Sequence, residues 1–182
     1  RIWKDTAPVK AEYDVFDLQW RFWLLASVMN GLDNNVPFWD AFTPEEILAF
    51  YECENYKYYM VKGPHPANLG RGWGYGCRIL ENIIETAEHN IRTGRHGIDM
   101  RFGHDGVLMA TMTALQADTW AELVDDPAKV KDVWHVYDIP ESANLQLVFY
   151  RSDSSDEILV KAMLNERDCH LPFEAVDGVF YK

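Results

Sequence analysis

The spacing of apolar residues changes after Ile91, and the change limits the folds that the chain can adopt. From Cys77 to Ile91 apolar residues recur at helical spacing, which predicts an amphipathic helix with its glutamates outside. Across residues 98–102 apolar and polar side chains alternate, which predicts a short strand that ends at Gly103. Another helix is expected from Val107 to Gln116.

Two β-rich runs follow near the end of the chain. Leu145–Tyr150 and Ile158–Leu164 are separated by the polar segment Ser152–Glu157, a pattern typical of two antiparallel strands joined by a turn. Together with the preceding helix, strand and helix, this hairpin indicates an α/β fold, in the form of a sandwich with an added helical part.

The first part of the chain is expected to be mainly helical. Val15–Met29 is apolar almost all round, which predicts a helix packed on more than one side. The turn-forming residues of Asn30–Pro37 predict a loop after it. Thr43 is an N-cap candidate, followed by Pro and then by Glu46 at the third helical position, so a capped helix should run to about Tyr58.

The segment Lys62–Gly76 contains five Gly and two Pro, which predicts a long ordered loop. Its glycine spacing and the absence of a preceding strand argue against a dinucleotide fingerprint, and a loop fits better, with the lining of a substrate cleft in the intact enzyme as an open alternative. Within it, Trp73 is the tryptophan best placed for binding. We expect one domain over residues 1–182, with a helical part at roughly 14–93 and the strand, helix and hairpin at 98–182.

Composition excludes some classes of protein. With 182 residues, 48% of them hydrophobic and 14% aromatic, the chain has enough apolar content to fold. A net charge of −12 disfavours nucleic acid as a partner, because such binding needs many Lys and Arg contacts. It does not exclude a phosphorylated small molecule, since a phosphate site needs only a few local donors.

The cysteines and the ends of the chain say less about its redox state, its partners and its full length. Cys53, Cys77 and Cys169 allow one bridge at most, and their redox state stays open. No leader and no run of about 18 apolar residues is visible, so a membrane is not an expected partner. Because the first residue is Arg1 and not Met, we expect that the true N-terminus lies upstream.

His104 and Asp105 are the most informative candidate site residues. The predicted strand ends at Gly103 and places both side chains directly before a helix N-terminus, where free N–H groups and the helix dipole favour an anion. An imidazole there could bind a phosphate oxygen, and a carboxylic acid could protonate a leaving group. The alternative is structural, with Asp105 as the N-cap and His104 as a satisfied neighbour.

The residues around His104 and Asp105 resemble those of a known family. The run RFGHDGVLMATMTAL resembles the strand, His-Asp motif and helix of the two-motif histidine acid phosphatases, most closely the branch of the multiple inositol polyphosphate phosphatases and phytases. Other stretches resemble the C-terminal half of that family in order and spacing, so the likeness covers nearly the whole chain. These stretches are Phe16–Ser27, the helix start at Thr43-Pro44-Glu45-Glu46, the Gly-rich segment, ESANLQLVFYR, ILVKAMLNE and LPF.

The resemblance implies a mechanism and a substrate class. It makes Asp105 the general acid and His104 a ligand of the transferred phosphate, in the hydrolysis of inositol polyphosphates through a phosphohistidine. No cofactor and no metal ion are implied. It also implies a secreted, periplasmic or secretory-pathway protein.

One part of the family's site is not found in these residues. The family's nucleophile is a His in an RHGxRxP motif, and Arg95-His96-Gly97 does not continue that motif, so His96 is expected in a solvent-facing loop. The nucleophile half should therefore lie upstream of Arg1, either missing by truncation or on another polypeptide. The alternative function is a non-catalytic ligand-binding or interaction protein derived from the fold.

The remaining histidines have no metal-ligand spacing, so surface or capping roles are expected for them. These are His65, His89, His135 and His170.

Overall fold

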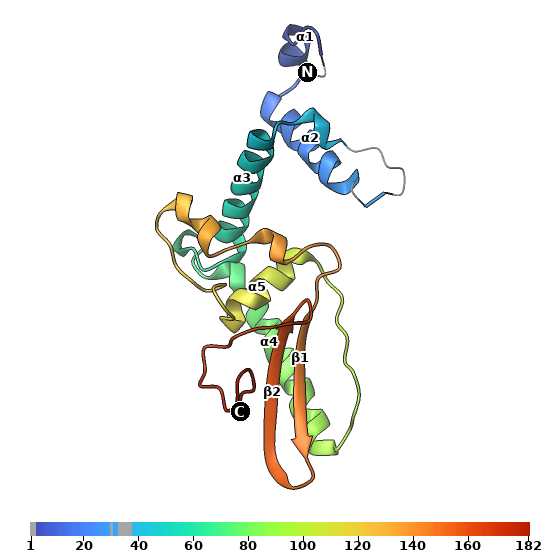
Figure 1. Cartoon of the computed structure of the whole chain (residues 1–182), viewed down its shortest axis with the longest axis vertical. Helices are drawn as coiled ribbons and strands as arrows, with labels where there is room; N and C mark the ends of the chain where they lie inside the picture. Colours follow the sequence, from blue (N-terminus) through green and yellow to red (C-terminus); the bar gives the residue numbers. More distant parts are fainter. Residues whose placement is uncertain (1–2, 30, 33–37) are drawn as a thin grey trace. The chain divides into compact units, whose positions relative to one another are not determined.

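The computed structural model describes residues 3–29, 31–32 and 38–182, which combine helices with one small antiparallel sheet, so the chain is broadly α/β (Figure 1). Two units are distinguished, unit 1 over Arg1–Cys53 and unit 2 over Glu54–Lys182. The helices are α1 (Ala7–Glu12), α2 (Val15–Met29), η1 (Trp39–Ala41), α3 (Pro44–Lys62), η2 (Pro66–Asn68), α4 (Arg71–Thr93), α5 (Asp105–Leu115), η3 (Pro127–Asp132) and η4 (Val136–Asp138). The strands are β1 (Leu145–Ser152), β2 (Ser155–Leu164) and β3 (Arg167–Asp168).

Unit 1 is built around the side chain of Trp23 on α2. This ring is 1% exposed, stacks on Phe50 at a centroid distance of 5.4 Å and meets Trp39 edge-on at 5.1 Å. The helix has the predicted bounds, and it packs on more than one side within unit 1, because Phe22 stacks on Phe38 at 5.5 Å and meets Trp3 edge-on at 5.7 Å. The large apolar residues of α2 that stay exposed are Val15, Phe16, Leu24, Leu25 and Val28.

The predicted loop at Asn30–Pro37 lies outside the described residues except for Gly31 and Leu32. The predicted helix start at Thr43 is confirmed. Glu46 N–H donates to Thr43 Oγ1 at 3.2 Å, and Thr43 N–H donates to Glu46 Oε2 at 2.7 Å, which is a reciprocal capping box. The helix continues past Tyr58 to Lys62.

The loop predicted for Lys62–Gly76 is wrong over its second half, because α4 begins at Arg71. Two of the glycines are needed for close packing of the helix rather than for a turn. A Cβ at Gly72 would lie 2.0 Å from the carbonyl oxygen of Val61, and one at Gly76 would lie 2.1 Å from that of Ala110. Glycine lowers helix propensity, but here it lets the backbones of α3, α4 and α5 approach one another.

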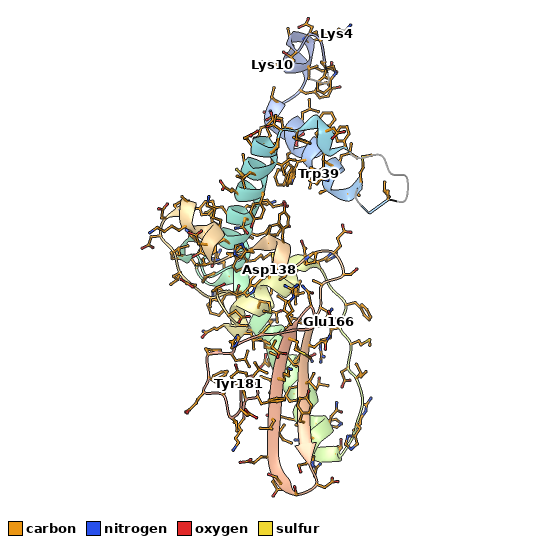
Figure 2. The ribbon with its side chains drawn as sticks, viewed as in Figure 1. Lys4, Lys10, Trp39, Asp138, Glu166 and Tyr181 are labelled. Atoms are coloured by element: carbon orange, nitrogen blue, oxygen red, sulfur yellow. The ribbon has the colours of Figure 1, made fainter. Side chains whose placement is uncertain are left out.

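The hairpin prediction is confirmed. β1 pairs antiparallel with β2 from Leu145 opposite Leu164 to Ser152 opposite Ser155, and β3 adds a short third strand to β2. The C-terminal segment lies beside the hairpin through a bridge between Val160 and Tyr181, as Figure 2 shows for the tyrosine. Sheet order β1-β2-β3 leaves β1 at an edge.

The strand predicted for residues 98–102 is wrong. α4 ends at Thr93 and is capped by Gly94, whose φ of 66° suits glycine. Residues 95–104 follow as an extended segment without strand pairing. Apolar and polar side chains do alternate along this segment, but a strand also requires a neighbouring strand that binds its main-chain N–H and C=O groups. No main-chain hydrogen bond joins residues 96–103 to the rest of the described chain.

A buried polar contact joins α3 to the segment before the hairpin. Asn55 is 1% exposed, donates to the carbonyl of Trp134 at 2.6 Å and accepts from Val136 N–H at 2.8 Å. The rings of Trp120 and Trp134 lie edge to face beside it, 4.5 Å apart. These contacts hold the C-terminal part of α3, which ends at Lys62.

Candidate functional site

The helix predicted at the His-Asp pair is confirmed, and α5 begins at Asp105. His104 occupies the N-cap position, with extended backbone dihedrals of −102° and 158°, and its ring makes no capping hydrogen bond. Asp105 is therefore the first helical residue and not the N-cap. Both side chains are exposed to solvent.

The Asp105 carboxylate already interacts with its own helix. Oδ1 accepts from the Gly106 N–H at 2.6 Å, while the N–H groups of Val107 and Leu108 are directed to the His104 carbonyl. A carboxylate at this position is favoured by the positive end of the helix dipole. Oδ2 has no hydrogen bond to another described residue, so it is the oxygen that is open to a ligand.

Lys62, the last residue of α3, brings a positive charge to the first turn of α5. A Cβ placed on Gly106 would lie 3.1 Å from Lys62 Cε and 3.8 Å from Nζ, so the side chain lies directly over this glycine. Its Nζ also lies 5.9 Å from the centre of the Tyr75 ring, within range of a cation–π contact. Lys62 makes no ion pair with another described residue. Nothing local in the sequence marks this lysine as a site residue.

Tyr58 is the second residue near Asp105 that the sequence patterns did not indicate. Burial raises the pKa of its hydroxyl, and the negative charges of Asp105 and Glu54 raise it further. The phenol therefore keeps its proton at neutral pH and remains a possible hydrogen-bond donor on this side of α5.

The packing of α5 against α4 fixes the direction of its first turn. Gly76 of α4 lies against the carbonyl of Ala110, and Met109, Ala110 and Met112 are fully buried. Thr111 and Thr113 are also buried, and each hydroxyl donates to a carbonyl one turn earlier in the helix. A helix held in this way positions His104 and Asp105 more firmly than a free loop would.

The other candidates are spread over the chain. His96 lies in the exposed segment after α4, where the sequence placed it. Trp73 lies within α4 and not in a loop, and is 37% exposed. His65 caps η2 by accepting from Ala67 N–H at 3.2 Å, which confirms a capping role.

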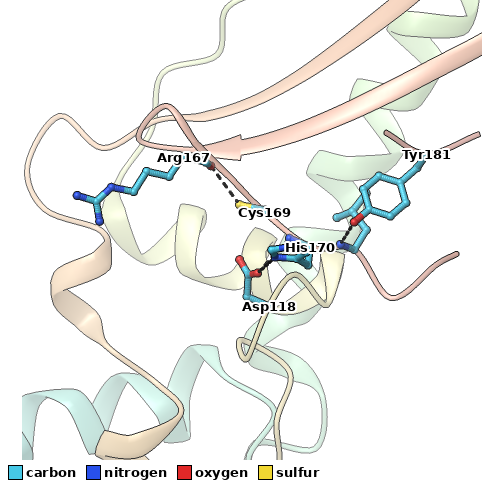
Figure 3. A network of polar contacts seen from close by, with 6 residues as sticks. Asp118, Arg167, Cys169, His170 and Tyr181 are labelled. Atoms are coloured by element: carbon cyan, nitrogen blue, oxygen red, sulfur yellow. Dashed lines mark hydrogen bonds and ion pairs between the residues drawn. The ribbon is translucent and has the colours of Figure 1, made fainter. Parts of the chain in front are cut away.

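His170 belongs to a polar network that anchors the C-terminal segment (Figure 3). Asp118 accepts from the main-chain N–H of His170 at 3.0 Å, and its Oδ1 lies 3.1 Å from the His170 ring. The Tyr181 hydroxyl accepts from Leu171 N–H at 2.9 Å. The network ties two loops together and includes neither His104 nor Asp105.

All three cysteines are free thiols, with Cys53 and Cys77 exposed and Cys169 buried. Burial raises the pKa of the Cys169 thiol to about 11, and the Asp118 carboxylate adds to the rise. A thiol of this kind is a poor nucleophile at neutral pH.

Two hollows are found elsewhere. One, of about 300 Å³, is an apolar pocket of unit 1 between α1, α2 and Phe50, and the other, of about 610 Å³, is an open groove along α4 beside Leu80 and Ile84. Neither is lined by His104 or Asp105.

In the part of the chain that the structure describes, no three His, Cys, Asp or Glu side chains gather as metal ligands. Within the same ranges no helix is long and apolar enough to cross a bilayer.

No protein-family model matches the chain, and no curated protein matches it. The relation to the histidine acid phosphatases therefore stays a prediction from the sequence.

Proposed function

We propose that this chain is the proton-donor half of a phosphomonoesterase that acts on inositol polyphosphates, with Asp105 as general acid and His104 as phosphate ligand. The observation that carries the proposal is the exposure of both side chains at the first turn of α5, beside the ammonium group of Lys62. A helix N-terminus and a nearby cation both favour an anionic substrate.

In the first step the nucleophilic His of an RHGxRxP motif attacks phosphorus. An N–P bond forms while the ester P–O bond breaks, and Asp105 gives its proton to the leaving alkoxide oxygen. Oδ2 is suited to this role because Oδ1 is engaged by the Gly106 N–H. The imidazole of His104 binds an oxygen of the transferred phosphoryl group.

In the second step a water molecule attacks the phosphohistidine. The Asp105 carboxylate takes a proton from this water, the N–P bond breaks, and inorganic phosphate and free imidazole are released. Asp105 returns to its acid form, so each cycle leaves the carboxyl group unchanged. Lys62 offers a positive charge to the phosphate in both steps.

The nucleophile must come from outside this sequence, because none of its six histidines lies in an RHGxRxP motif. The proposed partner is the N-terminal half of the same domain, whether upstream on the same polypeptide or on another one. The 182-residue chain alone should then release no phosphate from phytate.

The test is reconstitution. Phosphate release from phytate is measured for the chain alone, for an RHGxRxP-containing polypeptide alone and for the two together, with His104→Ala as the control. Activity that requires both polypeptides and fails with His104→Ala supports the proposal. Release by the chain alone would show that a nucleophile exists within it and would overturn the split site.

The absent nucleophile also favours a second function, that of a non-catalytic ligand-binding protein. Calorimetric titration with inositol hexakisphosphate separates the two. Binding that is lost in His104→Ala, together with inactivity in every reconstitution, would support the binding protein and exclude the enzyme.

A further inference from the structure

Lys62 carries the positive charge of the proposed phosphate site, but no hydrogen bond fixes the position of that charge. The residue ends α3, and its ammonium group makes no hydrogen bond or ion pair with another described residue. A lysine side chain has a flexible stem and much rotamer freedom, so an ammonium group without a partner occupies many positions. Something else must hold it beside α5.

The ring of Tyr75, on α4, is the contact that the structure gives to this ammonium group. Lys62 Nζ lies 5.9 Å from the centre of the ring, inside the range of about 6 Å in which a cation is attracted to a ring face. The stem of the same side chain lies over Gly106, with Cε 3.1 Å from where a Cβ would be. The ammonium group therefore lies between an aromatic ring of α4 and the first turn of α5.

The main chain at Tyr75 is fixed by close contacts on both sides of it. A Cβ at Gly72 would lie 2.0 Å from the carbonyl oxygen of Val61, in the last turn of α3. A Cβ at Gly76 would lie 2.1 Å from the carbonyl oxygen of Ala110, in α5. Tyr75 stands between these two contacts, so its ring has a rigid base, although the side chain is 67% exposed.

Arg101 is the arginine nearest to His104 in the sequence, and its guanidinium group is engaged elsewhere. It donates to Asn82 Oδ1 at 3.0 Å and to Thr86 Oγ1 at 2.9 Å, both on α4. The Lys62 ammonium group has no such bonds and lies beside the helix end. An anion at the first turn of α5 thus depends on Lys62 and on whatever positions it.

We propose that Tyr75 is a positioning residue of the phosphate site, whose ring holds the Lys62 ammonium group over the first turn of α5. The inference rests on the proposed function, since it requires that an anion binds at this helix end, but it requires neither the nucleophile nor phytate. A positioned cation binds an anion more tightly than a free one, because less conformational freedom is lost on binding. The energy of an exposed cation–π contact corresponds to about a two- to fivefold gain in affinity.

The test is calorimetric titration of the whole chain and its variants with inorganic phosphate. Tyr75→Leu should weaken binding by about two- to fivefold, while Tyr75→Phe, which keeps the ring, should keep most of the affinity. In a chain that already carries Lys62→Met, Tyr75→Leu should cause no further loss, because no ammonium group remains to be positioned. Tyr150→Leu, at an exposed tyrosine of β1, is the control and should leave the affinity unchanged.

Nuclear magnetic resonance of the chain with isotope-labelled lysine tests the contact without a ligand. The Tyr75 ring should shift the resonances of the Lys62 Hε protons. Tyr75→Leu should abolish this shift and Tyr75→Phe should keep it. If the unsubstituted chain shows no such shift, the proposal is overturned, whatever the chain binds.

Several results of the titration would also overturn it. Unchanged affinity in Tyr75→Leu would show that the ammonium group needs no positioning, and equal losses in Tyr75→Phe and Tyr75→Leu would show that the hydroxyl binds phosphate directly. A loss that adds in full to that of Lys62→Met would show that the ring acts independently of the lysine. An unsubstituted chain that binds no phosphate would overturn this inference together with the proposed anion site, whereas inactivity in every reconstitution would overturn the enzyme alone.

Discussion

Lys62, at the end of α3, lies over Gly106, in the first turn of α5, so closely that a Cβ on the glycine would be 3.1 Å from Lys62 Cε. This contact brings an ammonium group to the helix end that carries His104 and Asp105. It joins two segments that are far apart in the sequence, and it gives the proposed phosphate site its cation.

The first prediction concerns this lysine. Lys62→Met keeps the aliphatic length but removes the charge, so phosphate should bind about tenfold more weakly while the free energy of unfolding changes little. Calorimetric titration with inorganic phosphate measures the effect, and Lys129→Met, an exposed lysine of η3, is the matched control. Equal affinity of the Lys62 and Lys129 variants would remove the lysine from the site.

The second prediction concerns Gly106. In Gly106→Ala the new methyl group meets only the flexible end of Lys62, so the fold should be retained and the ammonium group displaced. The free energy of unfolding should change by less than about 1 kcal/mol, and phosphate should bind more weakly. An unaltered affinity would show that the position of Lys62 does not matter for binding.

The third prediction tests the crossing of α4 and α5. Gly76→Ala places a Cβ 2.1 Å from a main-chain oxygen, which cannot be relieved by a side-chain rotation, so it should destabilise the fold by more than about 2 kcal/mol. Gly74→Ala, in the same helix with open space around the Cβ, should stabilise by up to about 1 kcal/mol. Urea unfolding of the two variants gives the comparison, and similar free energies for both would contradict the close approach.

The fourth prediction follows from the raised pKa of Cys169, caused first by burial and then by Asp118. The unfolded chain loses this proton at a lower pH than the folded chain, so the thiol's contribution to stability is complete below about pH 9 and is lost as pH rises toward about 11. The free energy of unfolding should fall over this window, and it should fall less in Cys169→Ala. Tyrosine titrations are common to both proteins and cancel in the comparison.

A thiol reagent gives an independent check of Cys169. At about pH 8 Cys53 and Cys77 should react in the native protein, since both are exposed, and Cys169 only after denaturation. Three thiols reacting at the same rate would contradict the burial of Cys169.

Elements whose signals are local were predictable from the sequence. The capping box at Thr43 and Glu46 sets the start of α3 through contacts between neighbours in the sequence, and the two β-rich runs define the hairpin through their own pattern and turn. The His-Asp pair was placed correctly at a helix start for the same reason. In each case the information lies within a few residues.

Elements that depend on distant partners were not predictable. The glycines of α4 read as a loop, since only the positions of Val61 and Ala110 explain why Gly72 and Gly76 stand in a helix. The segment at 98–102 has a strand pattern, but pairing depends on a neighbour that the pattern does not contain. Lys62 has no local signal, because its role arises from where α3 ends relative to α5.

The proposed role of Asp105 as proton donor is tested most directly by how the rate depends on the leaving group. In the enzyme that we propose forms when this chain is combined with the nucleophile half, Asp105→Asn should slow hydrolysis of phytate by about a hundredfold or more, because the leaving alkoxide must be protonated. Hydrolysis of p-nitrophenyl phosphate, whose leaving phenolate is stable without a proton, should change far less. Equal losses on the two substrates, or none on phytate, would contradict the role of Asp105.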